Sequence, residues 1–197
     1  MGTDPLLLDE AAARALSGVT TATLTTVLLK KGLRNVWMRG SKSLRSGQKR
    51  VVGRAFTLRF VPVREDLATP ESWSAPISTR AAIEEMPSAC VVVVDAMGVT
   101  DAGIFGDILC ARMKKRGVAA LITDGTVRDV AGVLGTDLPV WCSGVAAPPS
   151  VAGLTFVDQV AHRARRMHPE WRAPHRALAT ARATQPERVP GTCENAM

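Results

Sequence analysis

Three polar residues have the types and spacing of a catalytic site. Asp107 is separated from the pair Arg128-Asp129 by the twenty residues 108–127. Carboxylate oxygens are hard ligands that Mg²⁺ and Mn²⁺ prefer, and such sites often use one or two carboxylates with waters and substrate oxygens. A guanidinium binds a carboxylate in a fork and stabilises a developing oxyanion. Together these groups suit a small 2-oxo acid whose carbon–carbon bond breaks to give an enolate.

The segments around these residues predict how they come together. Residues 89–94 (ACVVVV) form a continuous β-branched run, which predicts a strand buried on both faces. Residues 108–116 predict a helix that opens at Gly106-Asp107, and residues 118–123 predict a second apolar strand. Strand, helix and strand make a βαβ unit.

Open α/β sheets bind ligands at the carboxyl ends of their strands. Asp107 begins the crossover helix of the predicted unit, and Arg128-Asp129 follows its second strand. We therefore expect the two carboxylates and the guanidinium to face one crevice. The free amides at the helix opening, residues 106–109, would add an anion pocket for a substrate carboxylate.

Simpler interpretations of the same residues remain open at this point. An aspartate at a helix start is often only an N-cap, and an arginine beside an aspartate after a turn is often a surface ion pair. The spacing by itself does not separate these roles from a catalytic one.

The rest of the first 158 residues predicts further α/β elements. Phe56, Leu58 and Phe60 share one face of a predicted strand that must end or lie at a sheet edge at Pro62. The other expected elements are helices at 9–16, 20–31 and 79–85, a short helix ending at Leu134, a strand at 139–143, loops at 39–50 and 65–76, and a turn at 144–149.

Composition limits the function classes. Of the net charge of +7, a net +4 comes from seven Arg and three Glu in residues 159–197, which also hold several prolines and show no strand pattern. We expect a basic tail there. Aromatic residues make up 4% of the chain, with no Tyr, which argues against base stacking on a nucleic acid. The four cysteines lack zinc-ligand spacing, and no membrane span or signal peptide is evident, so we expect free thiols and a cytoplasmic protein.

Three segments resemble the RraA-like family, which includes 4-hydroxy-4-methyl-2-oxoglutarate aldolases and oxaloacetate decarboxylases. The most specific is GDILCARMKKRGVAALITDGTVRDV, with its aspartate, twenty residues and Arg-Asp pair; GRAFTLRFVPVRED at 53–66 and LSGVTTATLTTVLLKKG at 16–32 are also similar. The resemblance covers roughly residues 16–158 and implies a layered α/β sandwich of the swivelling β/β/α type. It also implies a homotrimer with the site near a subunit interface.

The resemblance assigns roles to individual residues. Those that would bind the substrate, mainly through backbone amides at the helix start, are Gly106, Asp107, Ile108, Leu109 and Arg128. Arg128 would also stabilise the enolate. Asp129 would ligate Mg²⁺ or Mn²⁺ directly, and Asp107 would hold a water at the metal that acts as acid or base.

These expectations define two regions, a catalytic domain at 1–158 and a divergent basic, Pro- and Arg-rich tail at 159–197, which does not match the family. The expected function is a metal-dependent aldolase or decarboxylase that yields pyruvate from a 4-hydroxy-2-oxo acid or oxaloacetate. The alternative is a regulator that binds a ribonuclease without catalysis, but a pure binding role has no use for Asp129 as a metal ligand. A methyltransferase lacks support because no glycine-rich nucleoside loop follows the first strand. The composition predicts neither a nucleic-acid nor a membrane partner.

Overall fold

The computed structural model describes residues 9–159 and 178–181, which form two β-sheets and a set of helices. The larger sheet has the order β1-β7-β5-β3-β2-β10, with β9 also paired to β2. Its strands are β1 Lys42–Ser43, β2 Val51–Pro62, β3 Val91–Asp95, β5 Ala120–Thr123, β7 Val140–Cys142, β9 Leu154–Gln159 and β10 Leu178–Ala181. The four strands β2, β3, β5 and β7 run parallel, and β1, β9 and β10 pair with them antiparallel.

The molecule also has a second, smaller sheet, whose strands alternate along the sequence with strands of the larger sheet. It consists of the parallel strands β4 Gly103–Phe105, β6 Thr126–Val127 and β8 Gly144–Val145. The sequence did not predict these strands, and the turn expected at 144–149 was wrong for Gly144–Val145. A strand of two or three residues is too short to show an alternating pattern.

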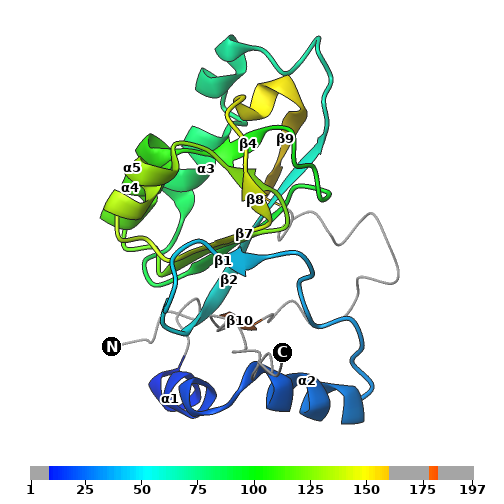
Figure 1. Ribbon diagram of the computed structural model, residues 1–197, viewed down its shortest axis with the longest axis vertical. Coiled ribbons are helices and arrows are strands. Elements are labelled where there is room, and N and C mark those ends of the chain that lie inside the picture. The colour runs from blue at the N-terminus through cyan, green and yellow to red at the C-terminus, as the bar shows by residue number, and fades with distance from the viewer. Residues whose placement is uncertain (1–8, 160–177, 182–197) are drawn as a thin grey trace, which may run out of the picture.

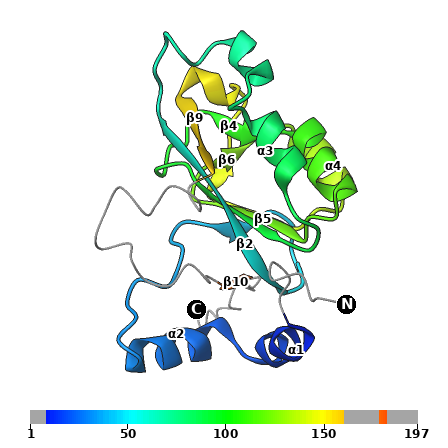
Figure 2. The same cartoon turned by 180° about the vertical axis from the view of Figure 1, so that it is seen from behind.

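The α-helices fall into two groups on opposite sides of the larger sheet (Figures 1 and 2). Their bounds are α1 Glu10–Gly18, α2 Thr21–Lys30, α3 Thr79–Glu85, α4 Asp107–Lys115 and α5 Val130–Gly135. The helices α3, α4 and α5 lie on one side of the larger sheet, and α1 and α2 lie on the other. Two short 3-10 helices, η1 Pro70–Ser74 and η2 Ser150–Ala152, complete the helical segments. Thr20 caps α2, since its hydroxyl accepts a hydrogen bond from the Thr23 amide at 3.1 Å.

The core explains the continuous apolar run in β3. Val92 and Val94 pack in the main core with residues of α3, α4 and α5, whereas Val91 packs in a second cluster with Ala120, Ile122 and Trp141. Successive side chains of a strand point to opposite faces, so both faces of β3 are buried.

Phe60 of β2 connects the two sheets. Its ring makes edge contacts with Phe105 of β4, at 6.3 Å between centroids, and with Phe156 of β9, at 5.3 Å. Such pairs add to the stabilisation that apolar burial provides. Because Phe105 is the last residue of β4, this packing fixes the point from which Gly106 and Asp107 continue into α4.

The expected α/β fold and its central unit β3–α4–β5 are confirmed. Two expectations were wrong in part. The loop predicted at 39–50 contains β1, which pairs with Trp141–Cys142 of β7, and the tail predicted to lack strands contains β10, which pairs with Val51–Arg54 of β2. Residues 160–177 and 182–197 of that tail lie outside the described residues.

Within the described residues, no single helix is long and apolar enough to cross a membrane. The consecutive helices α1 and α2, bent by 107° at their junction, meet the length and composition criterion only when taken together.

Candidate functional site

The smaller sheet positions the predicted residues. Strands β4 and β6 are parallel neighbours, and their carboxyl ends lead directly into Gly106-Asp107 and Arg128-Asp129. The Arg128 amide donates to the Phe105 carbonyl at 2.9 Å, which holds the two strand ends together. The sequence had placed the site at the carboxyl ends of the larger sheet's strands; it lies instead at the ends of the two short strands that follow them.

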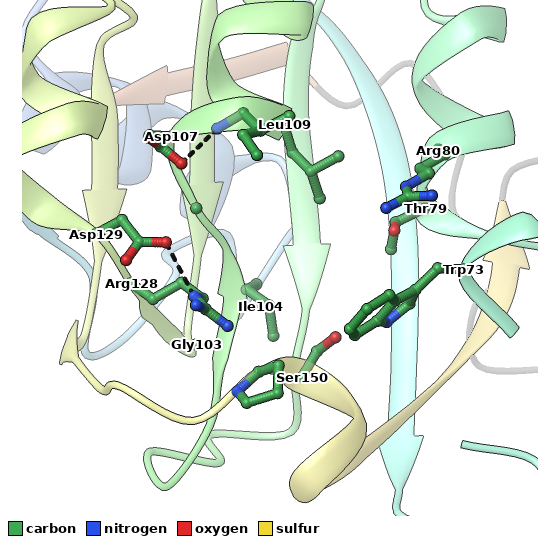
Figure 3. A pocket seen from close by; sticks show the side chains of 13 residues that line it. Trp73, Thr79, Arg80, Gly103, Ile104, Asp107, Leu109, Arg128, Asp129 and Ser150 are labelled. Atoms are coloured by element: carbon green, nitrogen blue, oxygen red, sulfur yellow. Dashed lines mark hydrogen bonds and ion pairs between the residues drawn. The ribbon is translucent and has the colours of Figure 1, made fainter. Parts of the chain in front are cut away.

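All six residues singled out from the sequence line one open pocket of about 220 Å³ (Figure 3). They are Gly106, Asp107, Ile108, Leu109, Arg128 and Asp129. Asp107 and Leu109 belong to the first turn of α4, where a helix leaves its amides without intrahelical partners. Ile108 lines the pocket although the residue is 78% exposed.

Asp107 does not act as the N-cap of α4. The N-cap is Gly106, and the Asp107 carboxylate accepts a hydrogen bond from the next amide, that of Ile108, at 2.7 Å. The Ile108 amide is therefore engaged by a side chain, and the amides of Asp107 and Leu109 are better placed for a ligand. The other Asp107 oxygen faces α5, where Gly132 leaves room for it.

Asp129 precedes α5 in an unusual backbone conformation. Its φ of 52° and ψ of 47° lie in the left-handed region, which aspartate tolerates better than most residues, and its side chain makes no capping hydrogen bond to α5. The turn directs the carboxylate toward Arg128 Nε, 3.0 Å from Asp129 Oδ2. The expected ion pair is thus present, but both side chains are partly exposed, at 34% for Arg128 and 47% for Asp129, and such pairs contribute little to stability.

The close approach of Asp129 to α4 depends on a glycine. A β-carbon at position 106 would lie 2.8 Å from Asp129 Oδ2, closer than real β-carbons come, and 3.2 Å from Arg128 Cγ, which is tighter than most real contacts. Gly106 therefore lets the start of α4 and the Arg128-Asp129 turn pack together, which brings a helix N-terminus, two carboxylates and a guanidinium to one pocket wall.

The residues present suit a loosely held divalent cation. Asp129 offers a half-exposed carboxylate at the pocket, Asp107 offers another from the adjoining helix, and Gly106 keeps the space beside Asp129 free of a side chain. Mg²⁺ is commonly bound by one or two carboxylates and keeps several waters. The described residues contain no group of three or more His, Cys, Asp or Glu side chains that could form a closed metal cage.

The sequence did not identify the opposite side of the pocket. Trp73 of η1, Thr79 and Arg80 of α3, and Pro149 and Ser150 near η2 line it (Figure 3). The Arg80 guanidinium carbon lies over the Trp73 ring, 5.8 Å from its centroid. A signal was present, because Trp73 is the only aromatic residue of the polar segment 65–76. A lone Trp in a polar loop indicates a sheltered surface against which its ring packs.

The three described cysteines are buried and free. Burial raises the pKa of the Cys90 thiol to about 11 and that of Cys110 to about 12. Buried neutral thiols are poor nucleophiles, and none of the three lines the pocket. Free core cysteines were expected for these three; Cys193 lies outside the described residues.

The chain is similar in sequence to proteins of a known family. A family model described as RraA-like, Aldolase/RraA, matches residues 18–161. The protein DlpA of Legionella pneumophila is 31% identical over 104 residues, 53% of this chain and 16% of its own length. A putative 4-hydroxy-4-methyl-2-oxoglutarate aldolase of Halalkalibacterium halodurans is 30% identical over 69 residues, 35% of this chain and 33% of its own length. The match thus spans no more than about a third of either relative.

A solved structure gives a longer match. Streptomyces coelicolor RraAS2, described as an unusual member of the RNase ES inhibitor RraA protein family, aligns with a TM-score of 0.67 at 32% identity. The alignment covers 77% of this chain and 71% of that one. The similarity therefore extends over about three quarters of this chain.

Proposed function

The chain belongs to the RraA-like family, and from this membership and the pocket we propose that it is a divalent-metal-dependent carbon–carbon lyase. Its proposed substrates are 4-hydroxy-2-oxo acids, of the 4-hydroxy-4-methyl-2-oxoglutarate type, or oxaloacetate, and its product is pyruvate. The observation that carries the proposal is the convergence of Asp107, Arg128 and Asp129 on one pocket wall beside the start of α4.

The start of α4 and Arg128 would bind the 2-oxo acid end of the substrate. The amides of Asp107 and Leu109 point out of the first helical turn, where the helix dipole also favours an anion. Arg128 Nε is held by Asp129, so its two terminal nitrogens remain for the substrate's 2-oxo oxygen. The ion pair would thus orient the guanidinium rather than neutralise a surface charge.

Asp129 would hold the divalent cation, Mg²⁺ or Mn²⁺, with Asp107 acting through a water molecule. The cation would supply Lewis-acid stabilisation of the charge that develops on the 2-oxo oxygen. This arrangement needs an open site, and the pocket wall formed by Asp107 and Asp129 is open to solvent.

Arg128 and Asp107 would have different roles in breaking the C3–C4 bond of the substrate. In the retro-aldol direction, the 4-hydroxyl proton would pass to the water oriented by Asp107, the C3–C4 bond would break, and its electron pair would pass to C3 and the 2-oxo group to give the pyruvate enolate. In oxaloacetate the same bond breaks with loss of CO₂. Arg128 would stabilise the enolate oxygen, and the water oriented by Asp107 would protonate C3.

We also propose that the chain assembles as a homotrimer. Large apolar side chains are exposed on α2 and in the segment that follows it, including Leu29 at 51% and Trp37 at 50%. Exposed apolar patches of this kind mark association surfaces. Light scattering coupled to size-exclusion chromatography would measure the assembly, and a monomer would contradict this part of the proposal.

A second candidate is a regulator that binds a ribonuclease without catalysis. It is favoured by the match to RraAS2, an unusual member of the RNase ES inhibitor RraA protein family. The lyase is preferred because a binding role does not require two carboxylates and an arginine on one wall of a pocket.

A pyruvate-release assay across several 2-oxo acids, with and without Mg²⁺, tests the proposal. We expect pyruvate from at least one 4-hydroxy-2-oxo acid or oxaloacetate, and much less from an Asp129→Asn variant that retains the wild-type circular dichroism. A protein that releases no pyruvate from any of them, yet lowers the rate of RNA cleavage by a ribonuclease, would favour the regulator instead.

A further inference from the structure

Arg80 is a second cation of the pocket, on the side opposite Arg128 (Figure 3). It lies in the first turn of α3 and is exposed. In the part of the chain that the structure describes, Arg80 makes no ion pair with an acidic side chain, whereas Arg128 is paired with Asp129. The acidic side chain of Glu84, on the same helix, is bound by Arg112 and Arg116.

Trp73 fixes the position of the Arg80 guanidinium. The guanidinium carbon lies 5.8 Å from the ring centroid, within the range of a cation–π interaction. A guanidinium stacked on a ring keeps its N–H edge free for in-plane hydrogen bonds to a carboxylate. The Ser150 hydroxyl lies on the same side of the pocket and offers another donor (Figure 3).

The positions of the two arginines on opposite sides of one pocket indicate the kind of ligand that fits. Arg128 and the start of α4 lie at one end, and Trp73, Arg80 and Ser150 lie at the other. Both ends line one pocket of about 220 Å³, which is smaller than the roughly 300–1,000 Å³ of sites for drug-sized ligands and suits a short ligand. Such a ligand would carry a negative charge at each end.

We propose that Arg80, positioned by Trp73, binds the distal carboxylate of a 2-oxo dicarboxylic acid and so selects diacids over 2-oxo monoacids. The assignment of the 2-oxo end to Arg128 and α4 rests on the proposed function. The selection itself is a binding property, and it can be measured without turnover.

The experiment uses two inert probes of equal chain length. 2-Oxoglutarate carries a distal carboxylate, and 2-oxopentanoate replaces it with a methyl group; neither has the 4-hydroxyl needed for aldol cleavage. Affinities of the full-length protein for both are measured by calorimetry with Mg²⁺ present. We expect 2-oxoglutarate to bind about tenfold more tightly or better, as for a hydrogen bond between charged groups.

Two variants locate the preference. Arg80→Gln should abolish it by weakening 2-oxoglutarate alone, and Arg80→Lys should restore only part of it, because lysine lacks the planar fork. Arg14→Gln, which removes the same charge from exposed α1 at the other end of the molecule, should keep the full preference.

Equal or absent binding of 2-oxoglutarate by the wild type, or a preference that survives in Arg80→Gln, would overturn the role of Arg80. A preference that depends on Arg80 in a protein that releases no pyruvate would uphold it while contradicting the lyase function. The two proposals therefore fail separately.

Discussion

Gly132 of α5 packs directly against the Asp107 side chain. A β-carbon at position 132 would lie 2.6 Å from Asp107 Cβ and 2.9 Å from Asp107 Oδ2. The relation is mirrored at Gly106, where a β-carbon would lie 2.8 Å from Asp129 Oδ2. Asp107 at the start of α4 thus packs against Gly132 of α5, and Asp129 before α5 packs against Gly106 before α4. The positions of both carboxylates depend on this close packing of α4 and α5.

Replacing Gly132 by alanine should displace Asp107. The clash involves the Asp107 β-carbon, which cannot move without shifting the helix, and overpacking of this kind costs about 1–3 kcal/mol. Since displacement of a catalytic group by about 1 Å can cost about 10²-fold, we expect kcat/KM for pyruvate formation to fall at least about tenfold.

Gly135→Ala is the matched control in the same helix. Nothing lies within 4 Å of a β-carbon at that position, so the substitution should leave activity unchanged and add up to about 1 kcal/mol of stability. Equal kcat/KM in the two variants, compared after thermal unfolding shows both to be folded, would argue against a role for Asp107.

Replacing Arg128 by lysine tests the guanidinium. Lysine keeps the charge, but it loses both the fork and the Nε that Asp129 holds at 3.0 Å. Loss of one oxyanion donor typically lowers the rate by about 10²–10³. Steady-state kinetics should show that loss in kcat, and a near-normal kcat/KM would mean that Arg128 does not stabilise the enolate.

The sequence predicted the residues of the candidate site, but it did not predict the short strands that position them. Asp107, Arg128 and Asp129 stand out because an apolar run, a helix and a second apolar run fix their order along the chain. The strands that deliver them, β4 and β6, have three and two residues and leave no periodic signal. Their pairing depends on contacts such as that of Phe60 with Phe105, between residues 45 positions apart, which local patterns do not contain.

The opposite side of the pocket was missed for a related reason. Trp73, Arg80 and Ser150 belong to three separate elements, and only the tertiary fold brings them to the pocket that Asp107 lines. The strand β10 was missed as well, because its residues LATA lie among prolines and arginines and pair with β2 more than a hundred residues earlier.

Ending the chain after Gln159 tests how far the tail contributes. This truncation removes β10 and its pairing with Val51–Arg54 but leaves every residue that lines the pocket. We expect a folded protein with metal-dependent activity and a lower Tm, by about 2–4 °C for each kcal/mol lost. Unfolding, seen by circular dichroism, would mean that the tail completes the domain. Loss of only a salt-sensitive interaction with RNA or a ribonuclease would favour the regulator.

The buried thiols predict both slow labelling and a dependence of stability on pH. Burial raises the pKa of Cys90 to about 11 and of Cys110 to about 12 from an ordinary 9.0, and it raises that of Cys142. In a Cys193→Ser background at about pH 8, a disulfide reagent should label these three only as fast as the protein unfolds. Labelling of all three within seconds would contradict their burial.

The raised pKa values of the buried thiols determine how the stability of the fold changes with pH. The folded chain holds these protons more tightly than the unfolded chain, so the stability they contribute is present below about pH 9 and is lost as the pH rises toward 11–12. Urea unfolding at a series of pH values, compared with a Cys110→Ala variant, would show the loss as a steeper decline in the wild type.

Pyruvate formation before and after removal of divalent metal tests the central claim most directly. With Asp129 as a direct ligand in an open, water-filled site, the metal should be weakly held, so excess chelator should abolish pyruvate release and added Mg²⁺ or Mn²⁺ should restore it. Asp129→Asn should show little activity at any Mg²⁺ concentration that saturates the wild type. Undiminished pyruvate release by the wild type in excess chelator would contradict the metal-dependent mechanism proposed for Asp107, Arg128 and Asp129.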